Sequence, residues 1–183
     1  GVQWLANPEI KEFMQMHGME TVLDLQGYFN EKVSQMLTKL GKRMIGWDEI
    51  LVPGLPTTAV IHSWRGKESL IEAAKKGYQT ILSNGYYIDL LQPAEFHYQN
   101  DPLLPEMGLT DEESKNILGG EATMWTEVVS PETIDSRIWP RTAAIAERLW
   151  SPREHCAVEG LHDRLEWINL RLEEVGLTHI KNY

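Results

Sequence analysis

Apolar residues follow two spacings along the chain, one helical and one of the short continuous kind that is typical of buried strands. Asn7-Pro8-Glu9 combines an N-cap residue, a first-turn proline and an acid, which predicts a helix start. Gly41 and Gly176 follow stretches of helical spacing and are typical helix ends. The pattern predicts helices over residues 7–18, 22–40, 68–76, 139–151 and 161–175.

Between these helices the spacing changes to short apolar runs rich in β-branched residues. The predicted strands are Arg43–Trp47, Thr58–Trp64, Gln79–Ser83 and Ile117–Trp125, with a long loop over 84–116. Strands that alternate with helices indicate a parallel sheet with βα connections. Four such strands fit half a (β/α)8 barrel or a small open sheet, since a complete barrel needs about 250 residues. The class is therefore α/β, and residues 1–183 are expected to form a single domain.

Composition and charge narrow the possible functions. The chain is 42% hydrophobic and 24% charged, as in ordinary globular proteins. No run approaches the roughly 20 apolar residues of a membrane helix, so no membrane partner is expected. The net charge of −10 repels phosphate backbones and argues against nucleic acid. Cys156 is the one cysteine, and the histidines show no metal-ligand spacing, so neither a metal nor a cofactor is expected.

Aromatic and acidic residues stand where the predicted strands end. Trp47, Trp64 and Trp125 each end or follow a strand, the turn at residues 86–89 follows another, and Glu127 comes just after Trp125. The carboxyl ends of parallel strands meet at one edge, which is where ligands bind in such folds. Indole faces stack on the C–H face of a pyranose, and carboxylates accept hydrogen bonds from its hydroxyls. The pattern predicts a sugar pocket.

Several other residues receive a structural interpretation. Asp48 and Glu49 are adjacent on a strand end and point to opposite faces, so Glu49 is expected to be a supporting carboxylate and Asp48 a rim residue. Glu121 is expected in a buried ion pair, with Arg65 or Arg141 as its partner.

The remaining aromatic residues divide between packing and a second sugar contact. His62 is expected to be a hydrogen-bonded core residue, and Tyr98 either an aromatic platform for a neighbouring sugar or a packing residue. The remaining tryptophans are interpreted as packing residues: Trp4, Trp139, Trp150 and Trp167.

Several motifs resemble those of family 20 glycoside hydrolases, the β-N-acetylhexosaminidases. They are Ile45-Gly46-Trp47-Asp48-Glu49, Ser63-Trp64-Arg65-Gly66, Tyr87-Ile88-Asp89, Gly119 through Glu127, and Trp139-Pro140-Arg141 through Ser151. The resemblance covers the whole chain in order. It implies the C-terminal half of a (β/α)8 barrel, strands five to eight.

The resemblance also implies a role for each residue of the predicted pocket. Trp47, Trp64 and Trp125 match the walls around the N-acetyl group and the sugar ring. Tyr87 matches the tyrosine that holds the acetamido oxygen. Asp89 and Glu127, in Tyr87-Ile88-Asp89 and Trp125-Thr126-Glu127, match the residues that bind outer sugar hydroxyls.

One departure from the family concerns catalysis. The family's adjacent Asp-Glu pair belongs to a His-x-Gly-Gly-Asp-Glu-like motif, which this sequence does not contain. The expectation is a fragment that supplies the sugar pocket, lacks the catalytic pair and is inactive alone. No catalytic residue is therefore assigned. Two alternatives remain, a non-catalytic carbohydrate-binding module and a different retaining glycosidase that uses Glu49 or Glu127.

The expected partner is a glycan that contains N-acetylhexosamine. Because a half barrel leaves two unpaired strand edges, the isolated chain is expected to pair with a second copy or to be partly molten. The glycan chemistry and the acidic charge suit a periplasmic, secreted or lysosomal parent protein and do not choose among these locations.

Overall fold

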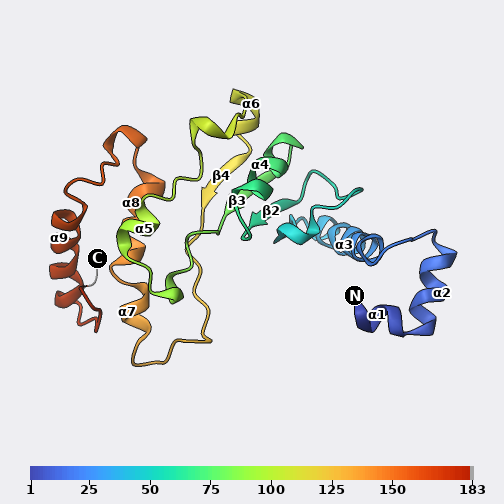
Figure 1. Ribbon diagram of the computed structural model, residues 1–183, viewed down its shortest axis with the longest axis horizontal. Helices are drawn as coiled ribbons and strands as arrows, with labels where there is room; N and C mark the ends of the chain where they lie inside the picture. The colour runs from blue at the N-terminus through green and yellow to red at the C-terminus, as the bar shows by residue number, and fades with distance from the viewer. Residues whose placement is uncertain (182–183) are drawn as a thin grey trace.

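The computed structural model describes residues 1–181 as a run of helices on either side of a small sheet (Figure 1). Helices α1–α3 lie at one end, the sheet and α4 in the middle, and α7–α9 at the other end. The helices are α1 Val2–Ala6, α2 Pro8–Met16, α3 Val22–Lys39, α4 Lys67–Lys75, α5 Ala94–Tyr98, α6 Asp111–Ser114, α7 Ile134–Ile138, α8 Arg141–Trp150 and α9 Leu161–Glu174. Within this part of the chain, no helix is long and apolar enough to cross a membrane.

The sheet has four parallel strands in the order β1-β2-β3-β4, which confirms the predicted class. The strands are β1 Ile45–Trp47, β2 Val60–Ser63, β3 Gln79–Leu82 and β4 Ile117–Gly120. Trp47 pairs with His62, and Ser63 pairs with Leu82 on the next strand. The register shifts between β3 and β4 at Thr80/Ile81. All four strands therefore end at the same edge of the sheet.

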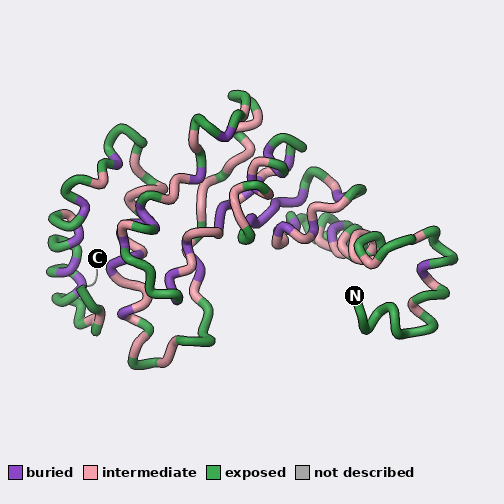
Figure 2. Tube along the Cα trace, viewed as in Figure 1, coloured by how far each residue is buried: buried purple, intermediate pink, exposed green. Residues whose placement is uncertain are grey.

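The core lies where the helices cover the sheet, and β2 is buried along its whole length. Burial on both faces fits a strand whose apolar and polar residues do not alternate. Around Ile61 and Ala73, β2 packs against α4, with Tyr78 beside them. A second cluster joins Leu82 of β3 to Ile145 of α8. In Figure 2 the buried segments concentrate in these central elements.

The N-terminal helices are defined by their caps more than by burial. The Asn7 side chain accepts from the backbone N–H groups of Glu9 and Ile10, as the sequence predicts for the start of α2. Thr21 and Asp24 form a reciprocal capping box at the start of α3. Across all three helices only Met14 and Ser34 are buried, so little packing holds this end within the described residues (Figure 2).

The segment predicted as a long loop over residues 84–116 contains α5, α6 and two 3-10 turns. Short capped turns of this kind carry little apolar periodicity, so the sequence pattern does not reveal them. In α5, Tyr98 is completely buried, and its hydroxyl donates to Glu147 of α8 at 2.6 Å. The prediction of a sugar platform at Tyr98 is wrong, and the alternative of packing is confirmed.

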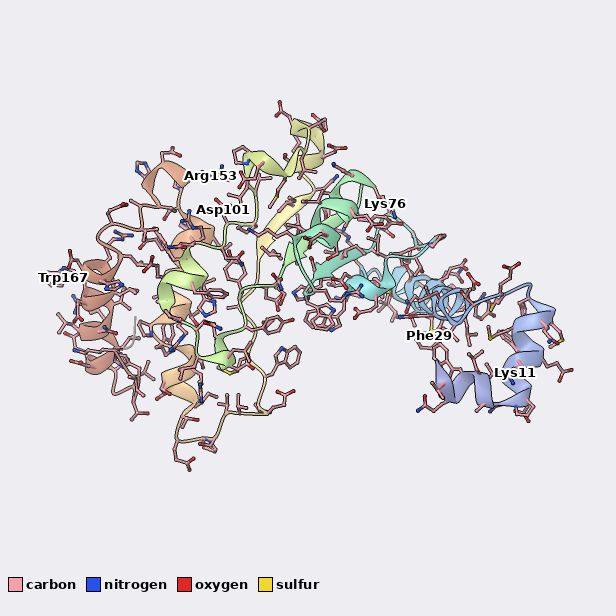
Figure 3. All side chains as sticks on the ribbon, viewed as in Figure 1. Lys11, Phe29, Lys76, Asp101, Arg153 and Trp167 are labelled. Atoms are coloured by element: carbon pink, nitrogen blue, oxygen red, sulfur yellow. The ribbon has the colours of Figure 1, made fainter. Side chains whose placement is uncertain are left out.

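Two further expectations need correction. The fourth strand ends at Gly120 and not at Trp125; past the strand only an isolated bridge joins Tyr87 to Thr123. Trp150 is 92% exposed and Trp167 is 74% exposed, so neither is a packing residue within the described chain. Trp167 lies on the outer side of α9, where no other element covers it (Figure 3).

Candidate active site

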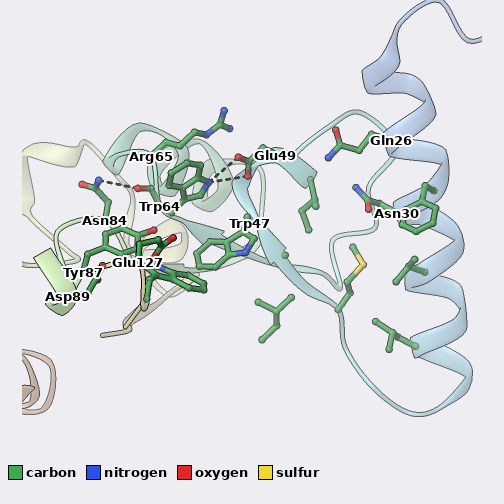
Figure 4. A pocket seen from close by; sticks show the side chains of 18 of the residues that line it. Gln26, Asn30, Trp47, Glu49, Trp64, Arg65, Asn84, Tyr87, Asp89 and Glu127 are labelled. Carbon is green, nitrogen blue, oxygen red and sulfur yellow. Dashed lines mark hydrogen bonds between the residues drawn. The ribbon is translucent and has the colours of Figure 1, made fainter. Parts of the chain in front are cut away.

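A cleft of about 1210 Å³ lies at the carboxyl ends of the strands. Its lining includes every residue predicted for the sugar pocket: Trp47, Trp64, Tyr87, Asp89, Trp125 and Glu127. Figure 4 shows Gln26 and Asn30 of α3 on one side, Tyr87 and Asp89 on the other, and Trp47 between them. The expected convergence on one rim is confirmed; substrate binding by these residues stays a prediction.

Trp47, the last residue of β1, forms the middle of the cleft wall. Its indole stacks on the imidazole of His62, with ring centroids 4.3 Å apart and planes 11° from parallel. It also faces Trp125 at 6.0 Å in a tilted arrangement. Tilted and stacked aromatic pairs are both favourable, so these rings support one another without a ligand.

Trp64 follows β2 and is held by a carboxylate. Its Nε1–H donates to both Oε1 and Oε2 of Glu49, each at 3.1 Å. Its backbone carbonyl accepts from the side-chain amide of Asn84 at 3.1 Å. The side chain is still 38% exposed, so a fixed indole face remains open toward the cleft. Glu49 is thus a supporting carboxylate, as predicted.

Asp48 points away from the cleft, so its prediction as a rim residue is wrong. It is buried, and its carboxylate accepts from Arg65 Nε at 2.5 Å and from Ser69 Oγ at 2.8 Å. The side chains of Asp48 and Glu49 point in different directions because both residues lie in a 3-10 turn, Asp48–Ile50. Asp48 fixes the β2–α4 loop while Glu49 faces the cleft.

Tyr87 and Asp89 come from the turn after β3. Burial raises the pKa of Tyr87, and a hydrogen bond with Ser83 opposes this in part. The carboxylates of Asp48, Asp89 and Glu49 act in the same direction as burial, so the pKa is raised overall and the hydroxyl stays protonated and can donate. The turn is fastened to the segment after β4, because Ile88 N–H donates to the carbonyl of Thr123 at 3.0 Å.

The Asp89 carboxylate has bonding capacity left over. The residue is only 4% exposed and lines the cleft, yet its Oδ1 has no hydrogen-bond partner among the described residues. Buried polar atoms are rarely left unpaired in a folded protein, because each costs about 1–3 kcal/mol. An unpaired acceptor that lines a cleft is suited to a ligand hydroxyl.

Trp125 and Glu127 lie on the segment that follows β4. Trp125 is 44% exposed, and Glu127 is exposed as well. No hydrogen bond to another described side chain fixes the Glu127 carboxylate, so it is free to accept from a sugar hydroxyl at the open side of the cleft. The cleft therefore combines flat apolar walls with two uncommitted carboxylates.

Glu121 differs from its prediction. Its side chain is 52% exposed, and it lies beside the imidazole of His62 and not beside an arginine, with Oε2 and Nε2 3.6 Å apart. Arg65 pairs with Asp48 instead, and the buried Arg141 donates to backbone carbonyls of Gln92 and Ser136. The shorter β4 explains the error, since Glu121 lies past the strand end and not inside the sheet.

His62 is a core residue, as predicted, but its Nε2 forms no hydrogen bond within the described residues. Burial lowers its pKa, so the ring stacked on Trp47 is the neutral imidazole at pH 7.

The α3 side of the cleft was not predicted from the sequence. Gln26, Asn30 and Phe29 line it from a helix far from any predicted strand end. Polar residues on a surface helix are common, and Phe29 fits the helical spacing of apolar residues in the same helix, so their types carry no signal. Arg65 and Asn84 also line the cleft and were missed, although each lies one residue past a predicted strand, which is a positional clue. No group of three metal-ligating side chains occurs in residues 1–181.

Comparisons with known proteins agree with the geometry. A family profile described as "Glycosyl hydrolase family 20, catalytic domain" matches residues 2–153. The human β-hexosaminidase subunit β is 30% identical over 95% of this chain and 33% of its own length. The pig protein of the same name is 35% identical over 95% of this chain and 34% of its own. The chain thus spans about a third of the length of these curated relatives.

Solved structures show the same similarity in three dimensions. A Flavobacterium johnsoniae chitobiase superposes with a TM-score of 0.93 and 53% identity, over 100% of this chain and 29% of that one. A Vibrio harveyi exo-β-N-acetylglucosaminidase, solved in complex with N-acetylglucosamine, gives a TM-score of 0.87 and 27% identity, over 97% of this chain and 30% of that one. The four-stranded α/β fold is therefore part of a (β/α)8 barrel, as the resemblance to family 20 implies.

Proposed function

Because the chain belongs to glycoside hydrolase family 20, we propose that it is part of a β-N-acetylhexosaminidase and that its cleft holds the terminal N-acetylhexosamine of a glycan. The reaction of the whole enzyme is hydrolysis of that terminal residue with retention of configuration. Three indoles and a tyrosine around one cleft are the observation that carries this proposal.

The apolar walls suit both faces of the substrate. The exposed faces of Trp64 and Trp125 offer stacking surfaces for a pyranose ring and for the methyl group of an acetamido substituent. Asp89 and Glu127 supply acceptors for the outer hydroxyls. A sugar site of this kind needs few polar contacts, provided that they are well placed.

The chemistry that fits this arrangement is substrate assistance. The substrate's acetamido oxygen attacks the anomeric carbon, the glycosidic C–O bond breaks, and a carboxylic acid protonates the leaving oxygen. Attack requires the acetamido group to be bent under the ring, and an indole cage restrains it in that position. Tyr87 donates a hydrogen bond to the acetamido oxygen and fixes it near the anomeric carbon.

The proton donor is proposed to lie outside this sequence, since the sequence has no His-x-Gly-Gly-Asp-Glu motif. Glu49 is an unsuitable substitute because both of its carboxylate oxygens accept from Trp64 Nε1. The chain therefore supplies recognition and orientation, and we expect it to leave a nitrophenyl N-acetylglucosaminide unhydrolysed by itself. General acid catalysis contributes typically about 10²–10⁴-fold.

The deciding experiment is calorimetric titration of the chain with N-acetylglucosamine and, as the matched control, with glucose. We expect binding of the first and at least tenfold weaker binding of the second. Tyr87→Phe should remove most of this difference because it deletes only the hydroxyl. Equal affinity for both sugars would contradict the proposal, and turnover abolished by Glu49→Gln would favour a different retaining glycosidase.

We also propose that the isolated chain self-associates through its sheet edges. Within the described residues, β1 and β4 each have a strand on one side only, and unpaired parallel edges invite further pairing. Light scattering at micromolar concentration should show a dimer. A stable, well-ordered monomer would contradict the proposal.

A further inference from the structure

The imidazole of His62 lies flat against the indole of Trp47, and the sheet itself creates this contact. The two residues are direct partners in the parallel register of β1 and β2. Their rings are 4.3 Å apart and 11° from parallel, whereas Trp47 meets Trp125 at 6.0 Å and 49°. The closest face-to-face support of Trp47 is therefore a strand residue, not a loop residue.

His62 is itself held firmly. It is buried, and β2, on which it lies, is buried at every position. Its Nε2 edge forms no hydrogen bond with the described residues, although Glu121 is 3.6 Å away. Because Nε2 forms no hydrogen bond there, the stacking of the imidazole face on Trp47 is the contact through which His62 acts on the cleft.

We propose that His62 is a positioning residue for the sugar site, whose ring holds the Trp47 indole in the plane required to contact the bound N-acetylhexosamine. The inference rests on the function proposed above and adds a residue that does not itself line the cleft. A tryptophan that is already ordered before binding loses less side-chain freedom on binding, so its orientation contributes directly to affinity.

The test compares two substitutions that differ only in whether a flat ring remains. His62→Ala removes the support, while His62→Phe keeps a ring that can stack. We expect His62→Ala to weaken N-acetylglucosamine binding about tenfold, which corresponds to about 1.4 kcal/mol. His62→Phe should stay within about twofold of the unmodified chain.

The matched control is Ile61→Ala, on the same strand. Ile61 is completely buried, and it belongs to the core cluster with Ala73 and Tyr78 and not to the cleft lining. Its truncation should lower the urea midpoint at least as much as His62→Ala does and leave the sugar affinity unchanged. If Ile61→Ala weakens binding equally, the effect of His62 is general loosening and the inference fails.

A second readout separates this inference from the proposed function. Near-ultraviolet circular dichroism reports the order of indole rings, and the Trp47→Phe variant identifies the part that belongs to Trp47. That part should disappear in His62→Ala and return in His62→Phe. If the unmodified chain binds no sugar but this pattern holds, the proposed function fails while His62 still positions Trp47. If the chain binds sugar and His62→Ala changes neither affinity nor spectrum, the inference is wrong.

Discussion

Aromatic rings, carboxylates and arginines meet in two places in this molecule, with opposite outcomes. Around Tyr98 the ring is completely buried, Glu147 accepts from its hydroxyl, and Arg164 donates to both oxygens of Glu147. Around the cleft, Trp64 and Trp125 stay partly exposed, and Asp89 keeps an unpaired oxygen. The same residue types therefore build a structural joint in one place and an open site in the other.

The difference is in how much bonding capacity remains. The Tyr98 cluster joins α5 to α8 and α9, and its acceptors are satisfied by its own donors. Arg148 lies over the Tyr98 ring at 4.5 Å and completes the enclosure. The cleft holds its walls in place with Glu49 and His62 but leaves ring faces and carboxylates unused. Residue type alone therefore does not identify a binding site. Exposed ring faces and unpaired carboxylate oxygens near the strand ends do identify one.

The largest expected effect is on stability at the structural joint. Tyr98→Ala should lower the free energy of unfolding by about 3–5 kcal/mol, because it removes a fully buried ring and one of the hydrogen bonds that Glu147 accepts. Urea unfolding measures this. Trp64→Ala is the matched control, and its effect should stay below about 1 kcal/mol because the side chain is partly exposed. Equal losses in the two variants would remove the distinction between joint and site.

Sugar binding should depend on residues of the cleft and not on exposed aromatic residues elsewhere. Trp125→Ala should weaken N-acetylglucosamine binding by at least tenfold, since a stacking face in the cleft is lost. Calorimetry measures the affinity. Trp167→Ala serves as control, because that exposed indole lies on α9 and not in the cleft. An equal effect of both tryptophans would contradict the assignment of the cleft.

The sequence predicted the parts of this picture that depend on strand ends. A residue at the end of a parallel strand has its location determined by the fold, so Trp47 and Trp64 were correctly placed together. Trp125 also lines the cleft, although β4 ends five residues before it. The sequence predicted that Asp48 and Glu49 point to opposite faces but not that Asp48 is buried, and it failed where burial depends on distant elements. Asp48 turned inward because a 3-10 turn replaced the strand, and Tyr98 was buried by two helices that follow it by about 50 or more residues.

A smaller effect should follow from loosening one wall. Glu49→Leu removes the acceptor of Trp64 Nε1 and should weaken sugar binding about threefold to tenfold. The reason is that a hydrogen bond from a neutral donor to a charged acceptor contributes about 1.5 kcal/mol. Glu49→Gln keeps an acceptor oxygen and should recover most of the affinity. Equal affinities for Leu and Gln at this position would show that the hydrogen bond does not orient Trp64.

The smallest expected effect is the pH dependence of the joint. Desolvation raises the pKa of Glu147, but hydrogen bonds from Arg164 and Tyr98 more than offset it, so the pKa lies below the ordinary value of 4.5. A carboxyl whose pKa is lower in the folded state stabilises the fold above its unfolded pKa. This stabilisation is lost as the pH falls from about 4.5 through the folded pKa.

Because Glu147 is partly exposed, solvent screening keeps its contribution below about 1 kcal/mol. Other carboxyls titrate in the same window, for example Asp24 and Glu113, whose pKa values are lowered by hydrogen bonds at helix caps. The informative quantity is therefore the difference in unfolding free energy between the unmodified chain and Glu147→Gln. It should be constant above pH 6 and shrink below pH 4.5. A difference that does not change with pH would show that Glu147 acts by packing and not by its charge.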